Sequence, residues 1–191
     1  MDNVINLTGK MLIAMPGMRD PRFEHSVILV CAHSDEGAMG LVVNRPMPEI
    51  GFSDLLAQLG IDTGTETLDI PVRFGGPVEP GRGFVLHRLA TETDDEGEAH
   101  MRIDGDLAMS TTRDILEDFA HGRGPQPAML ALGYAGWGPG QLDSEILDNG
   151  WLTSDRFDEL IFGADNSGKW SAALRGLGID PLALSPSAGR A

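Results

Sequence analysis

The sequence predicts an α+β fold built on a mixed, curled β-sheet. Apolar segments of strand length outnumber the segments with helical periodicity. The two kinds do not alternate one for one, as they do in a doubly wound parallel sheet. The length of 191 residues suits one domain, and neither an internal repeat nor a low-complexity linker divides the chain. We therefore expect a single domain over residues 1–184 and a C-terminal tail over residues 185–191.

The N-terminal part of the chain predicts three strands. Lys10–Met15 is a short apolar run that stops at a Pro-Gly pair, and Glu24–Ala32 is a longer, mostly apolar run. Gly40–Asn44 follows the polar turn at residues 34–37. Two β-branched apolar runs joined by a short polar turn with glycine are typical of a β-hairpin. We therefore expect the second and third strands to pair.

A helix is expected next, over residues 53–59. Ser53 is a suitable N-cap, since its hydroxyl can accept a hydrogen bond from a free amide of the first turn, and Gly60 can end the helix. Three leucines give this segment an apolar face. Ile70–Phe74 and Gly83–His87 then predict two strands on either side of a sharp Gly-Gly-Pro turn.

Two short strands and a second helix follow. Met101–Ile103 and Leu107–Met109 are apolar segments of strand length. Thr111 or Thr112 can cap a helix that runs through Ala120, because apolar residues spaced by three and four positions fall on one helix face.

The last third of the chain combines two strands with three helices. Ala128–Tyr134 predicts a buried strand, and a helix is expected over Pro139–Leu147, with its proline at the first helical position. Trp151–Thr153 predicts one more strand, whereas Phe157–Ile161 and Trp170–Leu177 predict short helices.

Charge and cysteine content limit the possible partners. The net charge of −15 arises from 29 acidic and 14 basic residues. Because nucleic-acid affinity comes mostly from lysines and arginines that neutralise phosphates, direct nucleic-acid binding is not expected. The acidic run at residues 92–98 predicts a solvated loop. No apolar run approaches the ~18 residues of a membrane span, and the single cysteine, Cys31, fits a reducing compartment. We expect a cytoplasmic protein with no membrane partner.

The segment LALGYAGWGPGQLDSEI, residues 130–146, places glycines between a strand and a helix. This is the general layout of an anion site. The spacing fits neither dinucleotide-binding nor phosphate-loop motifs, and Pro139 removes one amide donor. Asp143 and Glu145 would repel an anion. We favour a loop that turns the chain, while Tyr134, Trp137 and Gln141 could instead form a rigid ligand wall.

Three sequence blocks carry a resemblance to a known family. They are LTGKMLIAMPGMRDPRFEHSVILVCAHSDEGAMGLVVNRP, RFGGPVEPGRGFVLHR and GYAGWGPGQLDSEI, the last followed by Trp151 and Leu152. In this order they resemble the YqgE/AlgH family of bacterial proteins. The resemblance implies a compact α+β fold with a partly barrel-like mixed sheet flanked by helices. One branch of the family is named for a regulator of alginate production, and the family is often labelled as transcriptional regulators.

The resemblance implies motif positions but no agreed catalytic residues. Together with the ligand-wall reading, these positions give the candidate ligand-binding residues Asn44, Arg45, Gly75, Gly76, His87, Tyr134, Gly136, Trp137 and Gln141. The sequence contains no G-x-S-x-G, no C-x-x-C and no two histidines three or four positions apart. It therefore predicts no catalytic set, no metal site and no cofactor.

Two smaller constellations have competing interpretations. Cys31 and His33 share a strand face, so a redox-active thiol–imidazole pair is possible if the thiol is accessible and its pKa is lowered. We favour a buried cysteine and a histidine in a turn. His87 could form a small polar site with Arg45 and Arg73, but we favour arginines that pair with acids.

Three functional hypotheses follow. The first is a non-enzymatic regulatory protein that binds a small molecule or a protein partner. The second is a transcriptional regulator that binds DNA directly, which the acidity disfavours, and the helix at residues 53–59 is not followed by a recognition helix. The third is an enzyme of unknown class with a site near His87 and the glycine loop at residues 133–141.

Overall fold

The computed structural model describes residues 6–89 and 100–180. Within these residues one sheet of nine strands runs in the order β6-β7-β5-β8-β3-β2-β1-β9, with β4 added beside β8. The strands are β1 (Met11–Ala14), β2 (Val27–Ser34), β3 (Gly37–Val42), β4 (Val72–Phe74), β5 (Val78–Arg88), β6 (His100–Asp104), β7 (Leu107–Ser110), β8 (Ala128–Trp137) and β9 (Trp151–Ser154). The acidic run at residues 92–98 and the tail at residues 185–191 lie outside the described part of the chain.

The pairing confirms a mixed sheet in an α+β fold. The neighbours along the sheet are antiparallel, whereas β4 pairs with β8 in parallel. The order ends at β6 and at β9, so the sheet is not closed into a barrel. The predicted β2–β3 hairpin is confirmed, with Ser34 opposite Gly37 at its turn.

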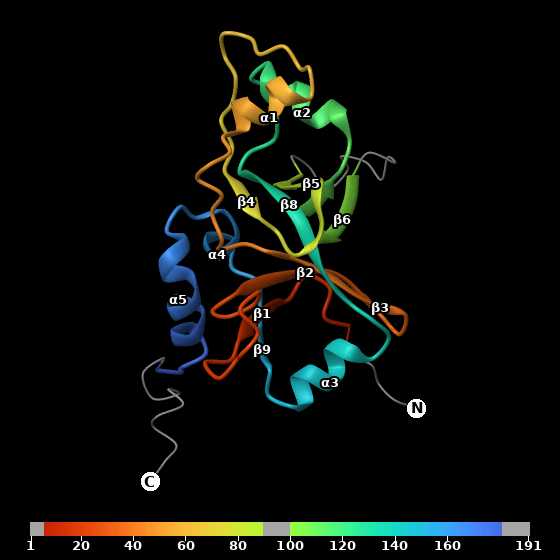
Figure 1. The fold of residues 1–191 in the computed structure, drawn as a ribbon, viewed down its shortest axis with the longest axis vertical. Coiled ribbons are helices and arrows are strands. Elements are labelled where there is room, and N and C mark those ends of the chain that lie inside the picture. The colour runs from red at the N-terminus through yellow and green to blue at the C-terminus, as the bar shows by residue number, and fades with distance from the viewer. Residues whose placement is uncertain (1–5, 90–99, 181–191) are drawn as a thin grey trace.

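Over residues 6–89 and 100–180 the structure also contains five α-helices and a short 3₁₀ turn. They are α1 (Phe52–Gln58), α2 (Arg113–Ala120), α3 (Gln141–Leu147), α4 (Asp158–Phe162), η1 (Asn166–Gly168) and α5 (Lys169–Gly176). Figure 1 shows α1 and α2 together at one end of the molecule, beyond β4, β5 and β8, with α3 at the opposite end and α5 along one side. No helix among the described residues has the length and apolar character to cross a bilayer.

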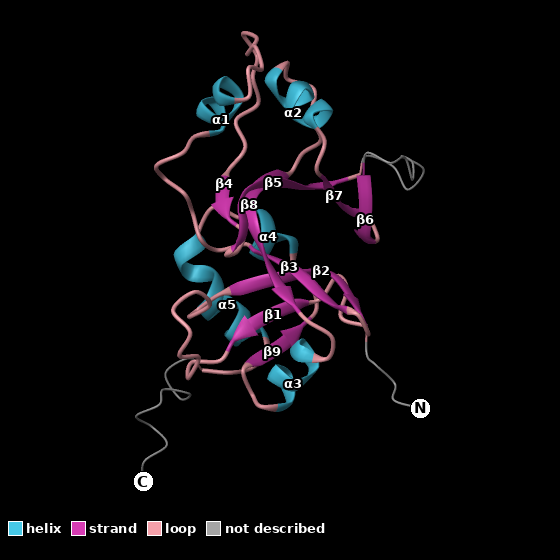
Figure 2. Cartoon of the chain, turned by 45° about the vertical axis from the view of Figure 1, so that its right-hand side comes forward, coloured by secondary structure: helices cyan, strands magenta, loops and turns pink. Residues whose placement is uncertain are grey.

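Strand β8 is the centre of the fold and corrects the predicted glycine loop. It continues through Trp137, so residues 133–137 are strand rather than loop. Figure 2 shows β8 passing from the β5 side of the sheet to β3. Gly133 adopts a φ of +76° within this strand, where the backbone of Gly76 approaches too closely for any side chain. The local sequence pattern predicts a loop at such glycines. In the structure they allow the backbone of β8 to pack closely against another backbone segment.

Two predicted helix starts are wrong. α1 begins after the N-cap Gly51, whose N–H donates to Asp54 Oδ2 at 3.0 Å, so Ser53 lies inside the helix. α3 begins after Gly140, which has a left-handed φ of +71°, so Pro139 precedes the helix. In each case a glycine provides the turn into the helix. The predicted cap position Thr112 of α2 is confirmed, although its side chain makes no capping hydrogen bond.

The core forms three clusters around the sheet. One lies between α1, α2 and the β5–β8 face, with Phe52 and Phe119 in edge-to-face contact at 6.1 Å between ring centroids. A second cluster contains residues from the other face of β5 and β8, together with residues of β1, β2, α4 and α5. The third packs α3 on β1, β2 and β3 through Trp137 and Trp151. The first cluster, beneath α1 and α2, borders the cleft described below.

Candidate functional site

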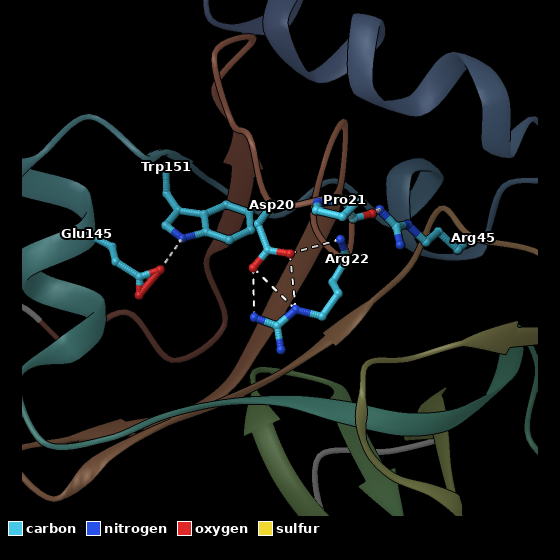
Figure 3. A network of polar contacts seen from close by, with 6 residues as sticks. All are labelled: Asp20, Pro21, Arg22, Arg45, Glu145 and Trp151. Atoms are coloured by element: carbon cyan, nitrogen blue, oxygen red, sulfur yellow. Dashed lines mark hydrogen bonds and ion pairs between the residues drawn. The ribbon is translucent and has the colours of Figure 1, made fainter.

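The predicted residues Asn44 and Arg45 tie a loop to the end of the β2–β3 hairpin. Asn44 accepts from Val27 N–H at 3.0 Å and donates to His25 O at 2.9 Å. The Arg45 guanidinium donates to Pro21 O (Figure 3) and to Glu24 O. These bonds use main-chain carbonyls, so Arg45 forms no direct ion pair among the described residues, although the charges of Glu24 and Asp20 act on it.

Gly75 and Gly76 lie where the chain between β4 and β5 crosses β8. A Cβ added to Gly75 would overlap Gly133 O, and one added to Gly76 would overlap the Tyr134 carbonyl group. This close approach of two backbones explains why glycine is needed at both positions. The space around them is filled by protein atoms.

The remaining motif residues occupy different surroundings. Trp137 is buried against Trp151, with ring centroids 6.1 Å apart. Tyr134 packs edge-on to Phe84. Gln141 Oε1 accepts from Gly138 N–H at 2.9 Å and closes its own turn. Gly136 lies in β8 opposite Met39. Among the described residues, the motif positions of the family therefore lie in different parts of the fold: Tyr134, Gly136 and Trp137 lie in β8, whereas Asn44 and Arg45 contact the chain before β2.

Cys31 and His33 do not form the redox pair considered above. Cys31 is 2% exposed, and burial raises the pKa of its thiol to about 12, where a redox sensor would need a lowered pKa. His33 is buried rather than in a turn: Leu7 N–H donates to its Nδ1 at 3.1 Å, and its Nε2 lies 3.4 Å from Asp143 Oδ1. The imidazole is therefore engaged away from the thiol.

We expect Cys31 to resist alkylation in the folded protein. Its buried, protonated thiol must be exposed by opening before it can react. Iodoacetamide at pH 8, followed by intact mass, should modify less than about a tenth of the native protein under conditions that modify all of it in denaturant. Rapid native alkylation would show instead that the strand carrying Cys31 opens easily.

Sequence reasoning missed Lys169 and the burial of Arg73, which are two neighbouring buried cations. Arg73 donates to Ile161 O and, at 2.8 Å, to Gly163 O. Lys169 Nζ donates to Val43 O at 3.0 Å and to Ile161 O at 3.4 Å. Burial lowers the pKa of Arg73 to about 10. Burial, reinforced by the neighbouring Arg73 charge, lowers the pKa of Lys169 to about 7. The prediction that Arg73 pairs with an acid is therefore wrong among the described residues.

His87 contacts a serine that no motif singled out. His87 and Ser110 are each 1% exposed, and His87 Nε2 lies 2.8 Å from Ser110 Oγ. His87 Nδ1 lies 3.2 Å from Arg88 O. Ser110 is opposite Val85 in the β5–β7 ladder, so it shares a sheet face with His87, two residues further along β5. The predicted cluster of His87 with Arg45 and Arg73 is replaced by this His–Ser pair.

A cleft of about 420 Å³ opens beside this pair, between α1, α2 and the sheet. Its walls are mainly leucines and a valine, including Leu55, Leu116, Leu130 and Val85. Its polar wall is the segment that leads from β7 into α2, residues 110–113. The cleft is therefore apolar with hydrogen-bonding groups along one side.

The exposed cations of the described residues mostly pair with acids. The ion pairs are Lys10–Asp155, Arg22–Asp20 (Figure 3), Arg82–Glu79, Arg88–Asp106, Arg88–Asp158, Arg156–Asp106, Arg156–Asp158 and Arg113–Glu117. Each neutralises a charge that could otherwise attract a phosphate.

The chain is similar to bacterial proteins over almost its whole length. A family model described as AlgH-like matches residues 11–182. A UPF0301 protein of Paracoccus denitrificans is 79% identical over 191 residues, which is 100% of both chains. A UPF0301 protein of Jannaschia sp. is 55% identical, over 97% of this chain and 96% of that protein. These names state no activity.

Two solved structures are similar in three dimensions. The solution structure of the AlgH protein from Pseudomonas aeruginosa has a TM-score of 0.76 and 38% sequence identity, over 100% of this chain and 99% of that chain. The crystal structure of protein DIP2367 from Corynebacterium diphtheriae has a TM-score of 0.71 and 21% identity, over 93% and 88%. At the latter identity the likeness concerns the fold alone.

Proposed function

The chain belongs to the AlgH-like family, and from this premise we propose that it acts by binding a small, largely apolar molecule in the cleft between α1, α2 and the sheet. The cleft volume of about 420 Å³ carries this proposal. Pockets for small molecules typically measure ~300–1,000 Å³ and combine apolar walls with a few polar groups. The motif residues that lie along β8 support the sheet behind the cleft.

The shape and lining of the cleft favour an amphiphile. Leu59 at its edge is 46% exposed, and apolar surface of this kind is stabilised when a ligand covers it. Ser110, Thr111 and Thr112 lie on the polar wall. A ligand with an apolar body and one hydrogen-bonding head group would match both parts.

A regulatory role, expected from the family resemblance, would then depend on ligand occupancy or on a protein partner. Direct DNA binding is disfavoured by the net charge of −15 and by the ion pairs of Arg22, Arg82 and Arg113 with neighbouring acids. The buried free thiol of Cys31 is compatible with the proposed cytoplasmic location.

Straight-chain alcohols from 1-hexanol to 1-decanol test this proposal. Each buried methylene contributes about 0.8 kcal/mol, so affinity should rise about fourfold per carbon until the cleft is full. Isothermal titration calorimetry with the full chain measures this series. Gly83→Leu should weaken 1-octanol binding at least about tenfold, because a Cβ there would lie 3.3 Å from Leu130 Cδ1 and 3.8 Å from Leu132 Cδ2, inside the cleft.

Gly17→Leu is the matched control for this substitution. Gly17 has no atom within 4 Å of an added Cβ and lies in the turn after β1. Its leucine variant should bind 1-octanol like the unsubstituted protein. Equal affinities in all three proteins, or no dependence on chain length, would exclude the cleft as the binding site.

A further inference from the structure

We propose that Ser110 and His87 act as a nucleophile and general base that hydrolyse carboxylic esters of apolar acyl groups. This inference rests on the proposed function, because the acyl chain would occupy the same cleft. It adds a chemical step to the binding event and assigns Ser110 as the residue that becomes acylated.

Two hydrogen bonds of His87 match the tautomer that this chemistry needs. The carbonyl oxygen of Arg88 can only accept, and it lies 3.2 Å from His87 Nδ1. In a neutral imidazole Nδ1 therefore carries the hydrogen, and Nε2 is left as the acceptor. Ser110 Oγ lies 2.8 Å from Nε2, and in this tautomer its hydroxyl can donate to that nitrogen. This distance is within the ~2.6–3.2 Å range of nucleophile–base pairs.

The local topology also suits a nucleophile. Ser110 is the last residue of β7, and α2 begins three residues later at Arg113. A serine between a strand and a helix is the layout of the nucleophile elbow in many hydrolases, here without its flanking glycines. The first amides of α2 have no partner within the helix, as in any α-helix. Since Thr112 makes no side-chain cap, these amides are candidates to stabilise an oxyanion.

Ser110 borders the space where an acyl chain would lie. Ser110 lines the cleft, and Val85, its partner across the β5–β7 ladder, lines it as well. The deep location of both side chains excludes most bulk water, which strengthens the hydrogen bond between them. An ester with an apolar acyl group is the substrate class that such walls accept, since most of the lining is leucine, valine and phenylalanine and Arg113 is the charged residue among the described residues that line the cleft.

The reaction proceeds in two balanced steps. Ser110 Oγ attacks the ester carbonyl carbon while His87 Nε2 takes the hydroxyl proton. The carbon–oxygen bond to the leaving alcohol breaks, and His87 returns the proton to that alcohol, which leaves an acyl-serine. Water then attacks the acyl-serine, again through His87, and the carboxylic acid departs with Ser110 restored.

p-Nitrophenyl esters from acetate to decanoate provide the test. The full chain should hydrolyse them, with a preference for acyl chains that fill the cleft. Ser110→Ala and His87→Asn should each lower the rate at least about 100-fold. Ser26→Ala is the matched control, since Ser26 is also fully buried but precedes β2 on another part of the fold. Its rate should stay within about twofold.

A second readout needs no variant to fold. A fluorophosphonate should modify the unsubstituted protein with one equivalent, located at Ser110 by peptide mass spectrometry. Modification of another residue, or a Ser110→Ala rate above about a third of the original, would overturn the proposal. If 1-octanol binds but esters are neither hydrolysed nor able to label Ser110, the ester chemistry is wrong and the proposed function stands. If 1-octanol does not bind either, both are wrong.

Discussion

Replacing Gly133 with alanine is expected to destabilise the fold by more than about 4 kcal/mol, a large part of the ~5–15 kcal/mol that holds a domain folded. Gly133 has a φ of +76° in the middle of β8. An added Cβ would overlap Gly76 O and would lie 3.2 Å from both Val78 O and Pro80 Cα. These are backbone atoms, so no side-chain rotation can relieve the overlap. Strand β8 cannot shift readily, because it pairs with β3, β4 and β5.

Gly140→Ala separates backbone conformation from steric overlap. Gly140 has a nearly identical φ of +71°, but nothing lies within 4 Å of an added Cβ. This variant should lose only the ~1–2 kcal/mol of a left-handed non-glycine residue. Urea unfolding followed by tryptophan fluorescence measures both losses. Similar losses in the two variants would mean that the β4–β5 corner can move away from β8.

Local sequence patterns suffice where the residues that determine an element are close together in the chain. The β2–β3 hairpin is predictable because its two apolar runs and its turn lie within one short segment. The glycines of β8 lead to a wrong prediction because the residues that require them are distant in the sequence. Gly133 is required by the chain around Gly76, more than fifty positions away, and no local signal reports that crossing. The predicted starts of α1 and α3 are wrong for a related reason. Gly51 and Gly140 are the N-cap residues, whereas the prediction used Ser53 as the cap of one helix and Pro139 as the first residue of the other.

The candidate site was predictable only in part. His87 could be found from its motif, but its partner Ser110 lies 23 positions away and becomes a neighbour only through the β5–β7 ladder. Lys169 gave no signal, since a lysine at the start of a helix is ordinarily solvated. Its contact with Val43 O spans 126 positions. Burial of polar side chains is a property of tertiary packing, so it escapes composition and periodicity.

The stability of the fold is expected to rise by roughly 2–3 kcal/mol between pH 7 and pH 9 because of Lys169. The side chain is 3% exposed, and burial lowers its pKa from 10.5 to about 7. In this window the unfolded chain holds a proton that the folded chain has released, so raising the pH favours the folded state. Below pH 7 the Lys169 side chain is protonated in both the folded and the unfolded state. The folded state is then destabilised by the full free energy of burying this charge. Urea unfolding at closely spaced pH values measures the slope.

Lys169→Met should flatten this dependence and should raise the stability at pH 6, because methionine fills similar space without a charge. The window must end near pH 9, since the thiol of Cys31, whose pKa is raised from 9.0 to about 12, makes stability fall above that point. Lys10→Met is the control: Lys10 is exposed, and its pKa is raised by Asp155, so its own contribution is lost only at higher pH. If Lys169→Met keeps the slope of the unsubstituted protein, the ammonium group of Lys169 must be hydrated in the folded state, and the packing of α5 against Val43 must be looser than its hydrogen bonds indicate.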